Sequence, residues 1–262
     1  MHLHLDVSTP PEVTDAPWLV LGHSLGTSSA LWTEVRALLA DRFRTVAWDL
    51  PGHGRSAPAP GPFTVGDLAD ALVDGLRERG IDDFRYAGVS LGGTVGIDLA
   101  VRHADRARAV TVISSGISVD APGAWVERAD AVVSGGTDQL VAGSLERWFA
   151  PTTHARRPSR VAELIAALRA ADDASYAFAC RALAAYDATG GLGAVDVPLL
   201  AVWGEHDRLV PEPKSAELAA AVRHGSLASV SGAAHAAPLE QPEAVADLLD
   251  TFPSPRSKGT SS

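Results

Sequence analysis

A serine between two glycines is the first residue whose surroundings favour covalent chemistry. Gly88-Val89-Ser90-Leu91-Gly92 fits the pattern G-x-S-x-G and stands after an apolar run and before a helical pattern. A sharp turn from a strand into a helix exposes the serine hydroxyl, and the glycines leave room for a strained backbone. We therefore expect Ser90 to be a nucleophile for acyl transfer, with an ordinary strand-to-helix turn as the alternative.

A serine hydroxyl is a weak nucleophile at neutral pH and needs an adjacent base. Nine histidines could supply it. His235 lies in a loop of small residues, after the last expected strand and before the last expected helix. Because the base must come from the carboxyl end of a strand, this position favours His235 over a merely solvated loop histidine.

The acid that orients the base should lie between the serine and the histidine in the chain. Gly204-Glu205-His206-Asp207 follows the strongest late apolar run and precedes Arg208-Leu-Val-Pro211. Acidic residues after strands are often solvated turn formers, and Glu205 is the nearest rival. The spacing favours Asp207 as the residue that orients His235.

Acyl transfer also needs donors for the oxyanion, each worth about 3 kcal/mol in the transition state. The backbone N–H of Leu91, directly after the serine, is one candidate. The loop over residues 22–27 can supply the other from Leu25. We interpret His23 and His53 as structural residues that join loops, because neither belongs to a group with the spacing of metal ligands.

Apolar runs typical of strands alternate with helical patterns over most of the chain. An alternating edge strand is expected at residues 2–8, and buried strands at 17–22, 44–49, 84–89, 109–114, 198–203 and, more weakly, 226–231. Helical patterns cover residues 30–40, 65–79, 92–102, 214–222 and 242–252. This alternation predicts an α/β fold with a mostly parallel central sheet and helices on both faces.

The alternation stops between residues 118 and 190, where the patterns are helical, notably at 158–169 and 175–186. An all-helical insertion between two strands is expected to form a lid over the strand ends, where ligands bind in open α/β sheets. We therefore divide the chain into a core of residues 1–117 and 191–252 and a helical lid of residues 118–190. The polar residues 253–262 are expected to be a disordered tail.

The composition excludes several kinds of partner. The chain has 262 residues, 46% of them hydrophobic, and a net charge of −10. A net anion offers little to nucleic acid or to an anionic membrane, and an anionic substrate would need a local cationic site. The single cysteine, Cys180, excludes an intramolecular disulfide and is expected to be a buried small residue. Without a signal-peptide pattern or a membrane-length apolar run, we expect a cytoplasmic enzyme.

Together these segments resemble the α/β-hydrolase superfamily. Within it, the chain is similar to the 3-oxoadipate enol-lactonases over about residues 15 to 252. The motifs that carry the closer resemblance are His23-Ser-Leu-Gly-Thr27 with Trp32 downstream, Glu146-Arg-Trp-Phe149, residues 176–183 and Glu240-Gln-Pro242. Thr94 departs from the pattern, because a methionine is more usual there.

The resemblance implies hydrolysis of a small carboxymethyl enol-lactone to 3-oxoadipate, through an acyl-enzyme on Ser90, in the degradation of aromatic compounds. It implies no cofactor and no metal. It also places Trp148 in the pocket, so the neighbouring Arg147 becomes the first candidate for binding the substrate carboxylate, with Arg156 and Arg157 as further candidates.

Other functions remain open at this point. A general carboxylesterase, or a perhydrolase of the cofactor-free haloperoxidase type, would use the same three residues. A binding protein without catalysis on the same fold is an alternative of another class. Ser90 itself excludes haloalkane dehalogenase and epoxide hydrolase chemistry, which needs an aspartate at this position.

Overall fold

One seven-stranded sheet organises residues 1–10 and 13–252, which the computed structural model describes. The spatial order of the strands is β1-β3-β2-β4-β5-β6-β7. Only β1 at the edge runs antiparallel to its neighbour, so the predicted mostly parallel sheet is confirmed. The strands are β1 (His4–Ser8), β2 (Trp18–Gly22), β3 (Arg44–Asp49), β4 (Phe84–Val89), β5 (Ala107–Ile113), β6 (Leu199–Gly204) and β7 (Gly225–Val230).

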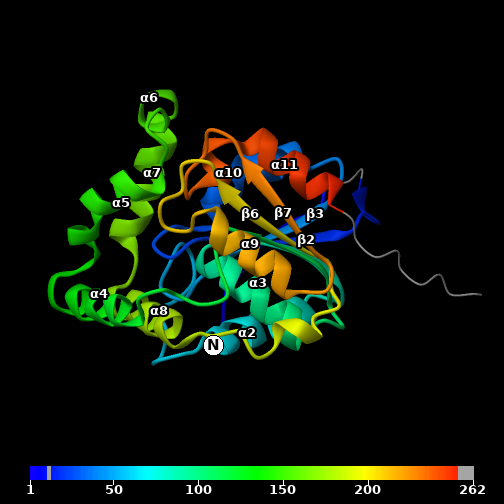
Figure 1. Ribbon diagram of the computed structural model, residues 1–262, viewed down its shortest axis with the longest axis horizontal. Helices are drawn as coiled ribbons and strands as arrows, with labels where there is room; N and C mark the ends of the chain where they lie inside the picture. The colour runs from blue at the N-terminus through cyan, green and yellow to red at the C-terminus, as the bar shows by residue number, and fades with distance from the viewer. Residues whose placement is uncertain (11–12, 253–262) are drawn as a thin grey trace, which may run out of the picture.

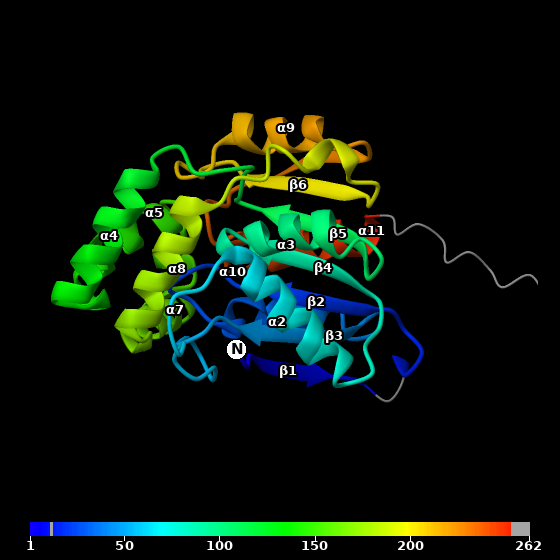
Figure 2. The same ribbon diagram turned by 90° about the horizontal axis from the view of Figure 1, so that it is seen from below.

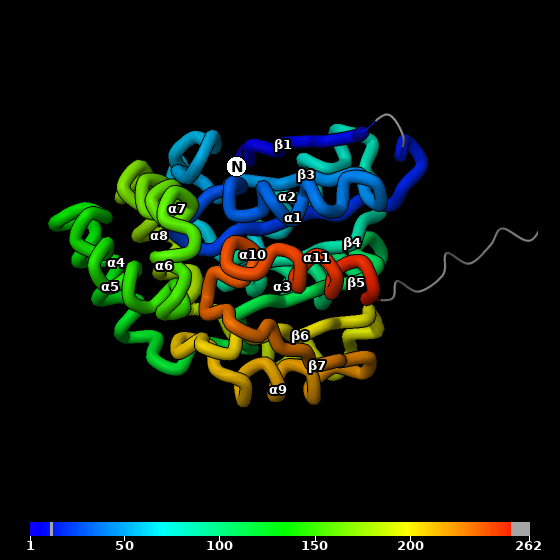
Figure 3. Tube along the Cα trace, turned by 90° about the horizontal axis from the view of Figure 1, so that it is seen from above, coloured from blue at the N-terminus to red at the C-terminus, as the bar shows by residue number. Residues whose placement is uncertain are grey.

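Helices cover both faces of the sheet, as the alternating pattern predicts. Figure 2 shows α2, α3 and α9 over one face, and Figure 3 shows α1 and α11 over the other. The short helices η4 (Leu192–Ala194) and α10 (Ala237–Glu240) belong to connecting segments. The flanking elements are η2 (Ser29–Trp32), α1 (Thr33–Leu38), α2 (Val65–Arg77), α3 (Leu91–Arg102), α9 (Glu212–Ala221) and α11 (Pro242–Thr251).

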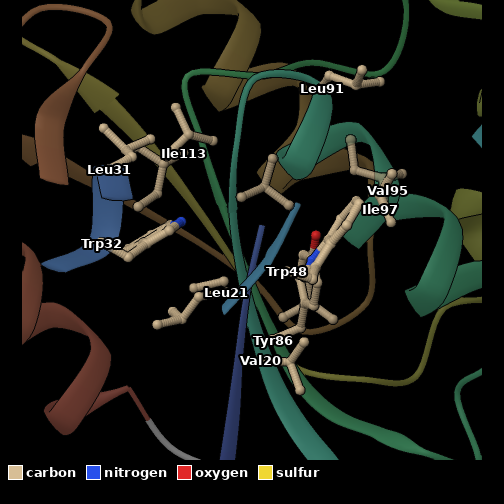
Figure 4. Packing of buried hydrophobic residues seen from close by; sticks show 14 of the residues in the cluster. Val20, Leu21, Leu31, Trp32, Trp48, Tyr86, Leu91, Val95, Ile97 and Ile113 are labelled. Atoms are coloured by element: carbon tan, nitrogen blue, oxygen red, sulfur yellow. The ribbon is translucent and has the colours of Figure 1, made fainter. Parts of the chain in front are cut away.

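Large buried side chains fix the centre of the sheet against these helices (Figure 4). Trp32 donates from Nε1 to the carbonyl oxygen of Gly22 at 3.1 Å, and Tyr86 donates to the carbonyl oxygen of Gly92 at 2.7 Å. Both aromatic rings are buried. These bonds satisfy the polar atoms of large core residues. They also fix the end of β2 and the first turn of α3, which begins directly after Ser90.

Five further helices lie between β5 and β6 and gather at one end of the sheet (Figure 1). They are α4 (Pro122–Gly135), α5 (Val141–Trp148), α6 (Thr153–Arg156), α7 (Pro158–Ala170) and α8 (Asp173–Ala185), with the short helix η3 (Thr137–Leu140) among them. A β-bridge between Ser118 and Asp187 joins the two ends of this segment, and the N–H of Ala188 donates to the carbonyl of Ile117 at 3.2 Å. The segment therefore leaves the sheet and returns to it at one place.

The predicted tail, residues 253–262, lies outside the described residues.

Candidate active site

Ser90 occupies a strained turn between β4 and α3. Its backbone angles are φ 55° and ψ −117°, a region that costs a residue with a side chain on the order of 1–3 kcal/mol and is concentrated at functional sites. The N–H of Ser90 donates to the carbonyl of Ile113 at 2.9 Å, which fixes the turn to the end of β5. The strand-to-helix turn expected from the sequence is therefore present, with its serine at the lining of a cavity.

The glycines on either side of Ser90 are required by close backbone contacts. A Cβ atom on Gly88 would collide with the carbonyl group of Gly92, and one on Gly92 would collide with the carbonyl group of Gly22. The strand, the turn and the helix can approach one another this closely only without side chains at these two positions.

Asp207 and His235 form a buried hydrogen-bonded pair. His235 Nδ1 lies 3.0 Å from Asp207 Oδ2, and both side chains are almost completely buried. Asp207 Oδ1 accepts the N–H groups of Leu209 and Val210 at 2.8 and 3.1 Å. Burial alone would raise the pKa of Asp207, but the charge interaction with His235 and these hydrogen bonds lower it below its ordinary value. Asp207 is therefore a carboxylate that holds the imidazole through Nδ1.

His235 belongs to the same cavity as Ser90. Ser90 and His235 both line it, and they come from the carboxyl ends of β4 and β7. Because Nδ1 is bound to Asp207, Nε2 is the nitrogen available to a hydroxyl in the cavity. The structure thus brings together all three residues that the sequence singled out for covalent chemistry. The rival acid Glu205 is exposed and instead accepts from Ser231 Oγ and the Gly232 N–H.

Two backbone N–H groups beside Ser90 have no hydrogen-bond acceptor among the described residues, those of Leu25 and Leu91. Leu25 lines the cavity, and Leu91 begins α3 directly after Ser90. N–H groups at the start of a helix favour negative charge nearby. Their placement fits the role of oxyanion donors.

His23 and His53 support the loop that carries Leu25. His23 Nε2 accepts the N–H of Leu50 at 2.9 Å, and His53 Nε2 accepts the N–H of Gly26 at 3.2 Å. Both rings are fully buried, and burial lowers the pKa of His23 and brings that of His53 to about 4. The interpretation of both residues as links between loops is confirmed by these bonds.

The cavity has a volume of about 250 Å³, which is small beside the roughly 300–1,000 Å³ of pockets for drug-sized ligands. Residues at the carboxyl ends of the parallel strands line one side, and residues of the segment between β5 and β6 line the other. Trp148 lies in this lining, as the resemblance implies. Thr94 lies there too, and its hydroxyl bonds to Ser115 Oγ at 3.0 Å.

The structure does not bring the three predicted arginines to this cavity. Arg147 is exposed on α5 and is not part of the lining. Arg156 and Arg157 lie in a separate surface hollow, where Arg157 pairs with Glu34. Successive residues of a helix point about 100° apart, so the side chain next to Trp148 faces another direction.

Sequence reasoning missed the cationic residues that do line the cavity, Arg128 on α4 and Lys214 on α9. Lys214 forms an ion pair with Asp120. Arg128 follows Trp125 by three residues, so the two share one face of α4, and Trp125 also lines the cavity. The spacing of Trp125 and Arg128 in the sequence indicates a shared helix face, but their place at the cavity is seen only in the fold.

Sequence reasoning also gave no role to Glu240, a buried carboxylate beneath the His235 loop. One of its oxygens accepts the Ala150 N–H at 2.6 Å and the Thr153 hydroxyl at 2.7 Å, and the other accepts the Ala234 N–H at 2.7 Å. Burial raises the pKa of Glu240, although these hydrogen bonds act in the opposite direction. The carboxylate therefore joins the residue before His235 to the chain between α5 and α6.

The described residues contain neither a metal-ligand cluster nor a membrane-spanning helix. No group of three or more His, Cys, Asp or Glu side chains is placed to hold a metal ion. In the same part of the chain, no helix is long and apolar enough to cross a membrane. Cys180 is buried and free, as expected, and burial raises its pKa to about 12.

Comparisons with known proteins point in one direction. The family model described as "Alpha/beta hydrolase family" matches residues 19–248. 3-Oxoadipate enol-lactonase 2 of Acinetobacter baylyi is 29% identical, over 88% of this chain and 86% of that protein. The crystal structure of the enol-lactonase from Burkholderia xenovorans LB400 superimposes with a TM-score of 0.91 at 30% identity, covering 95% of each chain. The pimeloyl-[acyl-carrier protein] methyl ester esterase of Vibrio cholerae is 28% identical, over 89% of this chain and 93% of that protein.

Proposed function

Because this chain belongs to the alpha/beta hydrolase family, we propose that it is a serine hydrolase of small carboxylic esters or lactones. Ser90 is the nucleophile, His235 the general base and Asp207 the residue that orients the base. The observation that carries this proposal is that the buried Asp207–His235 pair and the strained Ser90 turn meet at one cavity.

The reaction follows from these positions. Ser90 Oγ attacks the substrate carbonyl while its proton passes to His235 Nε2, and the Asp207 carboxylate stabilises the resulting imidazolium. The N–H groups of Leu25 and Leu91 stabilise the oxyanion. His235 then gives its proton to the leaving oxygen, and an acyl group stays on Ser90. A water molecule, deprotonated by His235, attacks this ester, and the product acid leaves as Ser90 recovers its proton.

For the substrate, we infer a carboxymethyl enol-lactone that opens to 3-oxoadipate in the degradation of aromatic compounds. The similarity to the enol-lactonases of Acinetobacter baylyi and Burkholderia xenovorans supports this inference. The small cavity also fits a five-membered ring better than a long acyl chain. When the lactone opens, its leaving enol ketonises, so the acyl group on Ser90 has six carbons and ends in a carboxylate. We place this reaction in the cytoplasm.

The segment between β5 and β6 then serves as a lid. Residues 118–190 supply one side of the cavity, through Trp125, Arg128, Trp148 and Tyr176, and the core of residues 1–117 and 191–252 supplies the reacting groups. The bridge between Ser118 and Asp187 supports a division at this place. A lid of this kind excludes water and selects the substrate.

A general carboxylesterase is the second candidate, and the similarity to the Vibrio cholerae methyl ester esterase favours it. Hydrolysis of the enol-lactone and of neutral 4-nitrophenyl acetate by the wild-type protein separates the two. We expect the enol-lactone to have the higher kcat/KM, and S90A to lose about 10³-fold or more on both substrates. Rapid hydrolysis of the acetate without hydrolysis of the enol-lactone would favour the general carboxylesterase. Binding of the enol-lactone without turnover of either substrate would contradict the proposal that the protein is an enzyme.

A further inference from the structure

Two cationic side chains line the cavity, and they differ in what they contact. Lys214 pairs with Asp120, the one acidic residue in the described lining. Arg128 forms no ion pair with any residue that the structure describes, and its polar neighbour in the cavity is the uncharged Tyr176 hydroxyl. The positive charge of Lys214 is compensated by the protein, and that of Arg128 is not.

Burial makes the isolation of Arg128 costly. Its side chain is half-buried, and its Nε atom is shielded from solvent without an acceptor. A buried donor without a partner costs about 1–3 kcal/mol, and more when it is charged. Native proteins retain such a group where a ligand supplies the missing acceptor.

Two aromatic rings hold the guanidinium in position. Arg128 Cζ lies 5.5 Å from the centre of the Trp125 ring and 5.8 Å from that of Tyr176. Both rings line the cavity, and Trp125 comes from the same helix as Arg128 while Tyr176 comes from α8. Burial raises the pKa of Tyr176, so its hydroxyl stays neutral and does not compensate the charge. The site is therefore prepared for an anion before any ligand arrives.

We propose that Arg128 is the specificity-determining residue that binds a carboxylate at the end of the substrate remote from the scissile bond. This proposal rests on the serine-hydrolase function above and deepens it. A guanidinium offers a fork of donors that binds a carboxylate through two bonds, and such bonds are stronger than neutral ones. Local binding is needed because the net charge of −10 repels an anionic substrate at long range.

A matched pair of esters tests this role. Mono-(4-nitrophenyl) adipate places on Ser90 a six-carbon acyl group that ends in a carboxylate, and 4-nitrophenyl methyl adipate places there the same group with its charge removed. Wild-type protein is expected to favour the anionic ester in kcat/KM. R128M keeps an apolar stem against Trp125 and Tyr176, and it should lower the ratio of anionic to neutral kcat/KM by about 10- to 100-fold.

Arg147 provides the matched control, because it is an exposed arginine of the same lid outside the cavity. R147A removes the same charge and should leave the ratio within about twofold of the wild type. An unchanged ratio in R128M, equal loss on both esters in R128M, or an equal shift in R147A would each overturn the role of Arg128.

A second variant and a binding measurement guard against damage to the fold. R128K keeps a cation on a flexible stem, and its ratio should lie between those of R128M and the wild type. Adipate should inhibit hydrolysis of the neutral ester by wild-type protein competitively, and about tenfold less by R128K; equal inhibition of the two would count against the proposal. Other outcomes would contradict the serine-hydrolase function itself. These are turnover of neither ester by wild-type protein, or full activity in S90A.

Discussion

His53 shows how burial of a neutral side chain makes the stability of the fold depend on pH. Its ring is fully buried and its Nε2 accepts the N–H of Gly26, a bond that requires the nitrogen to be deprotonated. Burial is the largest cause of its low pKa of about 4, and the nearby His23 contributes. An unfolded chain binds the proton with a pKa near 6.5, so the unfolded state takes up protons first as the pH falls.

His53 stabilises the fold fully above about pH 6.5, and this contribution is lost progressively as the pH falls towards 4. The loss amounts to about 3 kcal/mol of unfolding free energy between pH 7.5 and pH 4. Urea unfolding should show a smaller decrease in H53Q than in the wild type, by about this amount. H224Q, which changes an exposed histidine, should follow the wild type, and identical profiles for H53Q and wild type would contradict the buried neutral ring.

The sequence predicted some residues of the candidate site and missed others. Ser90, Asp207 and His235 each follow a strand at its carboxyl end, so the alternation of strands and helices was enough to expect them near one another. Arg128 could not be found in this way, because its importance lies in the absence of a partner. Such an absence appears only when α4, α8 and the cavity are in place.

At the scale of elements, two connections tie the lid to the loop that carries His235. The N–H of Ala236 donates to the carbonyl of Trp148 at 3.0 Å, on one side of the histidine. Glu240 holds the Ala234 N–H on the other side and also binds Ala150 and Thr153. Displacement of the lid would therefore displace the histidine, so the two should act as one unit.

Glu240→Gln tests this coupling. The amide nitrogen cannot accept a hydrogen bond, so at least one buried donor loses its partner. We expect the free energy of unfolding to fall by about 2–3 kcal/mol, and kcat to fall about tenfold on anionic and neutral esters alike, because the position of His235 matters to both. E243Q, an exposed glutamate in the first turn of α11, is the control and should change neither quantity. A large loss of stability with full kcat would show that Glu240 supports the fold without positioning His235.

The strands were predicted within about two residues, whereas the lid helices were predicted only in part. Buried parallel strands are continuous apolar runs bounded by polar turns, and that pattern does not depend on distant residues. Of the five lid helices, only α7 and α8 were predicted individually. In α4, only Ala129 and Val132 are buried hydrophobic residues, and Trp125 and Arg128 face a cavity. A helix that lines a cavity lacks the broad apolar stripe from which helices are recognised.

At the scale of the whole molecule, the parallel sheet is what assembles the site. Segments after β2, β4, β5, β6 and β7 reach the same cavity because the carboxyl ends of these strands share one edge. The segment that we propose as a lid lines the other side of the cavity. It contributes Arg128, the cation of the described lining that has no ion-pair partner. On the proposed function, a chain with a net negative charge would bind its anionic substrate at this local cation.

A covalent label that is mapped to a single serine tests whether Ser90 is the nucleophile. Ser24, Ser114 and Ser115 line the same cavity as Ser90, so the labelled residue must be mapped. Treatment with a fluorophosphonate, followed by intact-mass and peptide mass spectrometry, should find one adduct per chain, on Ser90. S90A should carry none, and H235A and D207N should label at least about 10³-fold more slowly, because the hydroxyl is then not activated. An adduct on another serine, or labelling of S90A at the wild-type rate, would contradict Ser90 as the nucleophile.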